Sequence, residues 1–118
     1  MKLRLKDNGR IVIMSLDAKS NEIPCFSSMK IALEKSLEKD RYILKFLKKN
    51  LGKFIEKKFV FKVILKRKDY IRMLKNRYIS CMLKMSAEQI KNGVNEILSE
   101  YRKKIVFKDK LICLIYKN

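Results

Sequence analysis

The strongest constraint on the fold is a short run near the middle of the chain, Phe59–Leu65. β-Branched and aromatic residues dominate it, and it is too short for an ordinary helix. A strand of this composition is buried on at least one face, so it needs covering layers, and the segments on either side have helical periodicity. We therefore predict a central strand whose flanking lysines and arginines stay in water at its two ends.

Turn chemistry predicts a hairpin before this strand. Asn8 and Gly9 form the pair favoured in a two-residue type I′ turn, because both positions need positive φ. The hairpin would join strands at Lys2–Lys6 and Arg10–Leu16. A loop, Asp17–Ser27, follows it.

A leucine stripe predicts the first long helix. Ser27 or Ser28 can cap its start, and Gly52 stands where a helix commonly ends. Asp40 interrupts the stripe, so the segment is either one helix or two with a kink. The stripe consists of Leu33, Leu37, Leu44, Leu47 and Leu51.

Two helical segments are predicted after the central strand. Asp69 is a suitable N-cap for a helix over Tyr70–Met85, and Ser86 with Gln89 matches a capping box for a following helix. One continuous bent helix is the alternative, because no loop residues separate the two segments.

The C-terminal segment predicts a second hairpin. Its strands would be Ile105–Phe107 and Leu111–Tyr116 around Lys108–Lys110, and the last strand, apolar on both faces, should be interior to the sheet. The expected fold is α+β, with a small mixed sheet of about five strands and two to four helices on one face, in the order β-β-α-β-α-α-β-β. Residues 1–118 would form a single basic domain, since no Pro/Gly/Ser-rich linker divides them.

The charge favours nucleic acid as the partner. The chain carries 30 Lys and Arg against 12 Asp and Glu, a net charge of +18. Between Arg41 and Lys84 there are fifteen basic residues and two carboxylates, whereas codon bias, the alternative explanation, would spread the lysines evenly. Only seven of the cations are arginine, which favours backbone or shape recognition over base reading, with RNA expected before DNA.

Catalysis has little support. The chain lacks histidine and any phosphate-binding glycine loop, and Cys25, Cys81 and Cys113 lack the spacing of a metal or redox site. We expect no enzyme, no cofactor and no metal, with a nuclease built on Asp and Glu as the less favoured alternative. No signal core or membrane span is present, so an intracellular, reducing, cytoplasmic location is expected, and an organellar or viral origin is also compatible with the sequence.

Two groups of residues are candidates for nucleic-acid contact. On the first long helix, Tyr42 and Phe46 point away from the leucine stripe, where they could stack on bases or pack against a partner protein. The second group comprises the cations at the two strand ends, which could contact phosphates or be ordinary solvated charges. The full candidate set is Arg41, Tyr42, Lys45, Phe46, Lys48, Lys49, Lys53, Lys57, Lys58, Lys66, Arg67, Lys68, Arg72 and Lys75.

Two resemblances point in the same direction. The segment Phe46–Ile55 resembles the helix-to-strand passage of the ribosome-binding factor A family, which has a KH-like fold. Without the first strand, the expected order β-α-β-α-β-β resembles the Alba proteins and the C-terminal domain of bacterial translation initiation factor three. Both resemblances imply binding to RNA or DNA.

The leading hypothesis is a non-enzymatic RNA-binding protein, a component or assembly factor of a ribosome or similar ribonucleoprotein. The alternative from another class is an interaction module that docks on an acidic protein through Tyr42, Phe46 and the same lysines. A basic peripheral membrane protein is a third alternative.

Overall fold

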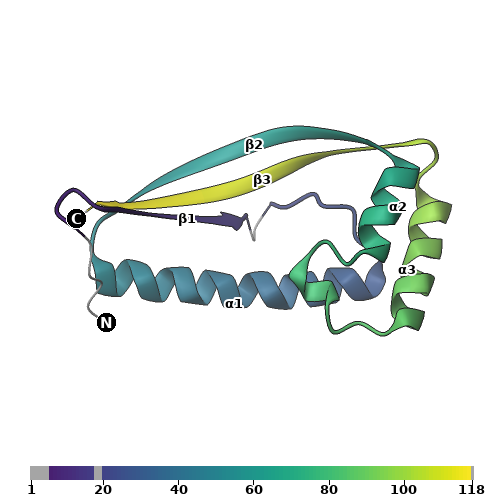
Figure 1. Ribbon diagram of the computed structural model, residues 1–118, viewed down its shortest axis with the longest axis horizontal. Helices are drawn as coiled ribbons and strands as arrows, with labels where there is room; N and C mark the ends of the chain where they lie inside the picture. The colour runs from purple at the N-terminus through teal and green to yellow at the C-terminus, as the bar shows by residue number, and fades with distance from the viewer. Residues whose placement is uncertain (1–5, 18–19, 118) are drawn as a thin grey trace.

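A computed structural model describes residues 6–17 and 20–117, which form one antiparallel sheet and three α-helices (Figure 1). The α+β class is confirmed. The sheet has three strands in the order β1-β3-β2, so the mixed sheet of about five strands and the order β-β-α-β-α-α-β-β are wrong. The elements are β1 (Arg10–Leu16), α1 (Ser27–Leu51), β2 (Phe54–Lys66), α2 (Arg67–Lys75), the 3₁₀ helix η1 (Ser80–Met82), α3 (Ala87–Glu100) and β3 (Lys104–Lys117).

The predicted C-terminal hairpin is a single strand. Lys108–Lys110, predicted as its turn, pairs in register with Val60–Lys62 of β2. This segment contains neither glycine nor proline, and the 13-residue β2 offers hydrogen-bond partners over nearly the whole length of β3. Pairing therefore continues through the segment, and β3 has 14 residues.

A turn is present near the predicted position, but it is not the predicted type I′ turn. The amide of Gly9 donates to the carbonyl of Lys6 at 2.7 Å, so the central residues are Asp7 and Asn8 rather than Asn8 and Gly9. Asn8 has a φ of 65°, but a type I′ turn at Asn8 and Gly9 would require a positive φ at Gly9 as well, and the φ of Gly9 is not positive. The strand predicted over Lys2–Lys6 lies, except for Lys6, outside the described residues. Its partner, predicted over Arg10–Leu16, is β1.

Phe59–Leu65 is a strand, but it is not central. It belongs to β2, which forms one edge of the sheet, and most of its side chains are exposed. The central strand is β3, as expected for a strand that is apolar on both faces. The misplacement arises because apolar character alone does not say which strand has two neighbours.

α1 is one continuous helix of 25 residues, so no kink interrupts it at Asp40. It stops at Gly52, whose φ of 90° is readily adopted by glycine. The predicted serine caps are absent, since Phe26 occupies the N-cap position without a side-chain bond. Instead, the carboxylate of Glu96 on α3 accepts hydrogen bonds from the Ser27 amide, at 3.2 Å, and from the Ser27 hydroxyl. The cap of α1 is therefore a tertiary contact that also places a negative charge at the helix N-terminus.

The helix predicted over Tyr70–Met85 ends early. α2 begins at Arg67, so Asp69 lies in its first turn rather than at the cap, and it stops at Lys75. Arg77 has a φ of 53°, and its guanidinium donates 2.6 Å hydrogen bonds to the carbonyls of Met82 and Met85. These bonds hold an irregular segment between α2 and α3, so a single bent helix is also wrong.

The predicted capping box of α3 is confirmed. The Ser86 hydroxyl accepts from the Gln89 amide, and the Gln89 side chain accepts from the Ser86 amide. This reciprocal pair satisfies two of the free amides at the start of the helix.

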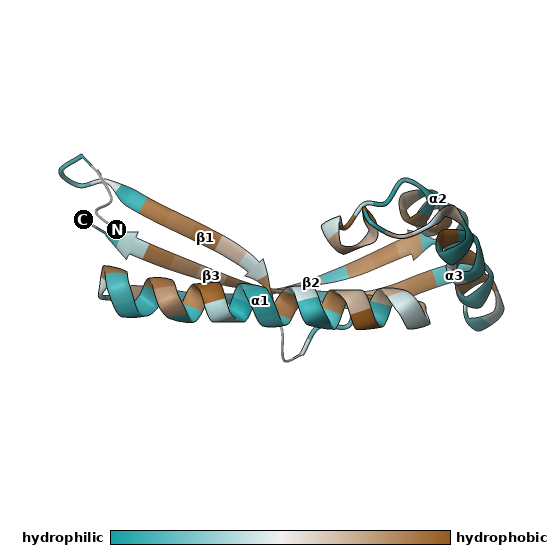
Figure 2. Ribbon diagram, turned by 90° about the horizontal axis from the view of Figure 1, so that it is seen from below, coloured by the Kyte–Doolittle hydropathy of each residue, from teal (hydrophilic) through white to brown (hydrophobic). Residues whose placement is uncertain are grey.

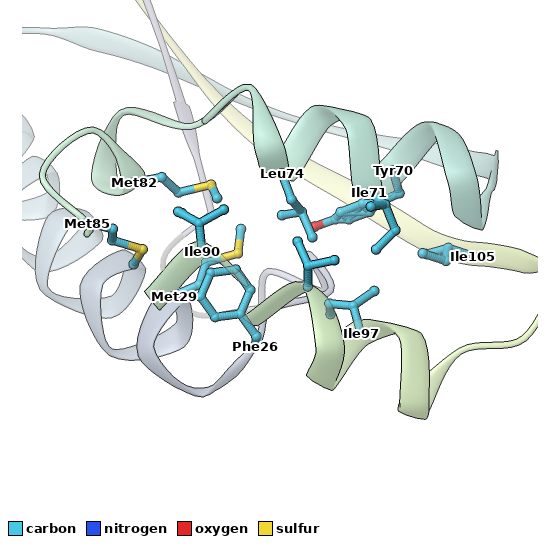
Figure 3. Packing of buried hydrophobic residues seen from close by; sticks show 11 residues of the cluster. Phe26, Met29, Tyr70, Ile71, Leu74, Met82, Met85, Ile90, Ile97 and Ile105 are labelled. Atoms are coloured by element: carbon cyan, nitrogen blue, oxygen red, sulfur yellow. The ribbon is translucent and has the colours of Figure 1, made fainter. Parts of the chain in front are cut away.

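Most of the large, fully buried side chains belong to one compact end of the molecule, which we call the head. It combines the start of α1, α2, η1, α3 and the adjoining end of the β2–β3 ribbon. Figure 3 shows side chains from these separate elements converging in one cluster. Its fully buried members are Phe26, Met29, Tyr70, Leu74, Met82, Ile97 and Ile105.

The rest of the molecule, which we call the arm, is long and thinly covered. It consists of β1, the segments Leu111–Lys117 of β3 and Phe54–Phe59 of β2 that lie beside β1, and the C-terminal half of α1. This half of α1 lies beneath the strands in Figure 1. The molecule measures 52 × 28 × 23 Å, and its radius of gyration is 17.1 Å. A compact chain of this length would have a radius of gyration of about 13–14 Å. Much of the arm surface is therefore exposed to solvent.

The three α-helices fall within the predicted two to four, but the prediction that they pack on one face of the sheet is wrong. The helices in the head and in the arm cover opposite faces of the β2–β3 ribbon. In the arm, the groove beside α1 is lined by Lys58 and Ile112, which are cross-strand partners. In the head, Leu65 and Ile105 pack in the core and are also cross-strand partners. Because side chains alternate along a strand, this pair points to the face opposite that of Lys58 and Ile112. The ribbon twists between the two, so all three helices lie below it in Figure 1 although they contact alternate side chains. Figure 2 shows the same twist from below, as the strands diverge from α1.

Candidate nucleic-acid interface

A basic groove lies between α1 and the sheet, where β1 ends. Its volume is about 560 Å³, and Ile112 and Leu114 line it from the sheet side. Four cations also line it, Arg41, Lys45 and Lys48 from α1 and Lys58 from β2. All four are among the residues predicted from the sequence, and the fold brings them together.

Two carboxylates offset part of this charge. Lys48 contacts Glu56 at 3.4 Å, and both side chains are about half exposed, so the pair contributes little to stability. Asp17 is buried at the groove, where its carboxylate accepts from the Ser20 hydroxyl at 2.9 Å. The groove therefore keeps an excess of positive charge.

From the groove, one face of the β2–β3 ribbon continues the positive surface, and we call it the basic face. It carries the side chains of Lys58, Val60, Lys62, Ile64 and Lys66 on β2 and of Lys104, Val106, Lys108 and Lys110 on β3, as the strand alternation and register require. Val60, Ile64 and Val106 are more than half exposed, so among the described residues no other element covers the part of this face that extends beyond the groove.

The basic face places lysines directly opposite one another. Lys62 pairs with Lys108 and Lys66 pairs with Lys104 across the two strands. In the described part of the chain, no carboxylate lies within ion-pair distance of these four lysines. Directly opposed like charges destabilise a sheet, by roughly 0.2–1 kcal/mol per pair. This cost falls if an anion lies over the pair.

Lys110 marks the limit of the uncompensated charge. It pairs with Glu22 at 2.7 Å, and the hydrogen bond from its ammonium lowers the pKa of that carboxyl. The Lys110 side chain is only 25% exposed, and the charge of Lys108 also lowers the pKa of Glu22. The described cations of the basic face that form no ion pair therefore lie on either side of Lys110, at Lys58 and along the head end of the ribbon.

The predicted cations of α2 are only partly available. The Arg67 guanidinium donates to the carbonyls of Leu98 and Tyr101, at 3.2 and 2.9 Å, so it caps the C-terminus of α3. Arg72 pairs with Asp69 at 3.5 Å on the surface. Lys68 and Lys75 are exposed. The candidate role of Arg67 is therefore structural in this fold.

The other predicted residues lie apart from the groove. Tyr42 and Phe46 are exposed on α1, by 76% and 54%, and Tyr42 borders Glu38 as well as Arg41 and Lys45. Lys49 and Lys53 are exposed near the end of α1. Lys57 points to the opposite face of the sheet from Lys58, because neighbouring strand residues alternate.

Sequence analysis missed Lys62, Lys104 and Lys108. Lys58, Lys62 and Lys66 recur at every fourth residue, a spacing that keeps them on one face of a strand. The four-residue spacing alone could therefore have added Lys62 to the predicted residues. Recognising the cross-strand partners required β3 to be one strand, whereas the sequence suggested a turn at Lys108.

The thiols carry no sign of activation. Burial raises the pKa of Cys25 to about 11, and it also raises the pKa of Cys81. Both thiols therefore stay protonated at neutral pH and are poor nucleophiles. Within residues 6–17 and 20–117, no three Cys, Asp or Glu side chains gather in a way that could hold a metal ion. Over the same ranges, none of the helices combines the length and hydropathy needed to span a bilayer.

Comparison of the chain with protein-family models, with curated proteins and with solved structures found no match. The segment Phe46–Ile55 does run from a helix into a strand, as its resemblance to the ribosome-binding factor A family implies. The observed order β-α-β-α-α-β lacks the final strand pair of the Alba proteins and of the initiation-factor domain. The topology therefore does not support the second resemblance.

Proposed function

We propose that this protein is a non-enzymatic nucleic-acid-binding protein that contacts the phosphate backbone, with RNA as the first ligand to test and a ribonucleoprotein as its setting. The observation that carries the proposal is a row of lysines on an exposed face that form no ion pair among the described residues, Lys62 opposite Lys108 and Lys66 opposite Lys104. A polyanion over these pairs would relieve their repulsion and release its own counterions, and both effects favour binding.

The spacing of the cations suits an extended backbone. Lys58, Lys62 and Lys66 follow one another at four residues, roughly 13 Å along a strand. Together with the groove cations they would form a positive track along the ribbon. Lysines suit this role, because each is a mobile point charge that contacts phosphates without fixed geometry.

The apolar residues of the basic face argue for backbone contact rather than base stacking. Val60, Ile64 and Val106 lie between the lysines, and none is aromatic. Proteins that stack single-stranded bases use aromatic side chains for it. We therefore expect a weak sequence preference and a strong dependence on salt.

A salt series tests the proposal. The variant Lys62→Gln/Lys66→Gln/Lys104→Gln/Lys108→Gln removes four proposed phosphate contacts, so the slope of log K against log salt should flatten by about three. Fluorescence anisotropy would follow binding to one sequence prepared as single-stranded and duplex RNA and DNA. The control variant Lys35→Gln/Lys39→Gln/Lys84→Gln/Lys91→Gln changes net charge equally at exposed sites elsewhere. Equal slopes for the two variants would contradict the assignment of the site.

A further inference from the structure

The sheet in the arm has a second uncovered face, which we call the apolar face. It carries Val12 and Met14 from β1, Leu111, Cys113 and Ile115 from β3, and Ile55, Phe59 and Phe61 from β2. Val12, Met14, Ile55 and Phe61 are 58%, 55%, 49% and 51% exposed. The rings of Phe59 and Phe61 stack on each other with their centroids 6.3 Å apart. These residues form a contiguous hydrophobic surface over three strands.

The residue pattern of β3 indicates that another element or a partner molecule packs on this face when the protein functions. A sheet with one face in water alternates apolar and polar side chains. Leu111–Tyr116 is apolar at every position, a pattern typical of strands covered on both faces. α1 covers one face of this segment, where Ile112 and Leu114 line the groove beside it. In the described part of the chain, no element covers the other.

The dimensions suit one helix. The outer strands of a three-stranded sheet lie about 10 Å apart, which is close to the diameter of a helix with its side chains. Ile55 to Phe61 spans roughly 20 Å along β2, the length of about 13–14 helical residues. A helix docked here would complete a helix-sheet-helix sandwich with α1.

The charged residues at the border of this face indicate which charge a docked helix should carry. At the head end of the face, Asp109 is the cross-strand partner of Phe61 and is partly buried. At the opposite end, Arg10 and Lys117 are cross-strand partners, and Lys57 lies on the same face at the β2 edge. All three are exposed. Two copies of this chain packed face to face would bring these cations together, whereas a partner with carboxylates beside its apolar stripe would neutralise them.

We propose that the apolar face binds an acidic amphipathic helix of a partner protein, with its apolar stripe on Val12, Met14, Ile55 and Phe59 and its carboxylates beside Arg10, Lys57 and Lys117. This site is separate from the proposed nucleic-acid surface. Lys57 and Lys58, adjacent in sequence, would serve the two different ligands.

A designed peptide tests the proposal on the full chain. The probe is a helix of about 18 residues with a leucine stripe flanked by glutamates, and its counterpart carries lysine for each glutamate. We expect the glutamate peptide to bind with a Kd on the order of 10–100 µM and the lysine peptide at least tenfold more weakly. Amide chemical shifts should change at Val12, Met14, Ile55 and Phe59, and absence of binding would overturn the proposal.

Matched variants locate the site. Ile55→Thr should weaken peptide binding about tenfold, whereas Ile64→Thr, on the same strand but the opposite face, should leave it unchanged. Lys57→Glu should weaken binding severalfold, and Lys58→Glu should affect nucleic-acid binding instead. Sedimentation equilibrium should show a monomer, so a dimer abolished by Ile55→Thr would overturn the proposal in favour of self-association. Equal peptide affinities, or shift changes at these four residues on adding single-stranded RNA, would overturn it as well.

Discussion

The head and the arm differ in how they use hydrophobic residues. Seven of the eight largest fully buried side chains lie in the head, and Leu114 is the one in the arm. Most of the strongly exposed apolar residues are in the arm, among them Val12, Met14, Ile43 and Ile55. The head therefore has the hydrophobic core expected of a small domain, whereas the arm exposes apolar side chains that a partner could bind.

This difference shows how one ribbon supports two surface chemistries. In the head, β2 and β3 bury Leu65 and Ile105 and expose lysines on the other face. In the arm, the same strands have turned, so the lysine-bearing side faces α1 and apolar side chains face water. Strand alternation separates the two chemistries, and the twist decides which of them is exposed.

Truncation of one leucine in each region gives the largest contrast. Leu74→Ala removes a fully buried side chain from the head and should cost about 2–5 kcal/mol of unfolding free energy. Leu47→Ala removes a half-buried side chain from the arm, so about 1 kcal/mol is expected. Urea unfolding of both variants measures the difference. Similar losses would mean that the arm is packed as firmly as the head.

A methyl group in the head should have the next largest effect. A Cβ at Gly93 would lie 2.4–2.5 Å from three ring atoms of Phe26, which is itself fully buried. Because the ring is buried, it must shift against its neighbours to admit the methyl group, so Gly93→Ala should cost about 1–3 kcal/mol despite the better helix propensity of alanine. The control is Asn95→Ala, an exposed site on α3 that should be neutral or slightly stabilising. Equal stability of the two variants would contradict the packing of α3 on Phe26.

Local chemistry allowed part of this fold to be predicted. The end of α1 at Gly52 and the capping box at Ser86 each depend on residues within one turn of chain. A turn near Asn8 was also predicted, although it lies one residue earlier than expected. The errors involve distant contacts. α2 stops because Arg77 reaches the carbonyls of Met82 and Met85, and β3 continues because β2 pairs with it through Lys108–Lys110.

In the candidate site too, the features set by local sequence were predicted and those set by distant contacts were not. The cations of α1 were found from helical periodicity, and Arg41, Lys45 and Lys48 do share a groove. The opposed pair Lys62 and Lys108 depends on register, which a single sequence does not show. The structural role of Arg67 was not predicted for the same reason, since its hydrogen-bond acceptors lie more than 30 residues away.

The last predicted effect is a loss of stability at alkaline pH that originates in the head. Burial raises the pKa of the Cys25 thiol from 9.0 to about 11. Between these values the unfolded chain has already released the proton that the folded chain keeps, so this contribution is complete below pH 9 and is lost as the pH rises toward 11. Cys25→Ala should therefore flatten the fall of unfolding free energy over this range, measured by urea unfolding at each pH. A slope like that of the wild type would assign the alkaline loss to another group, Tyr78 first, because desolvation raises the pKa of this partly exposed phenol to about 12.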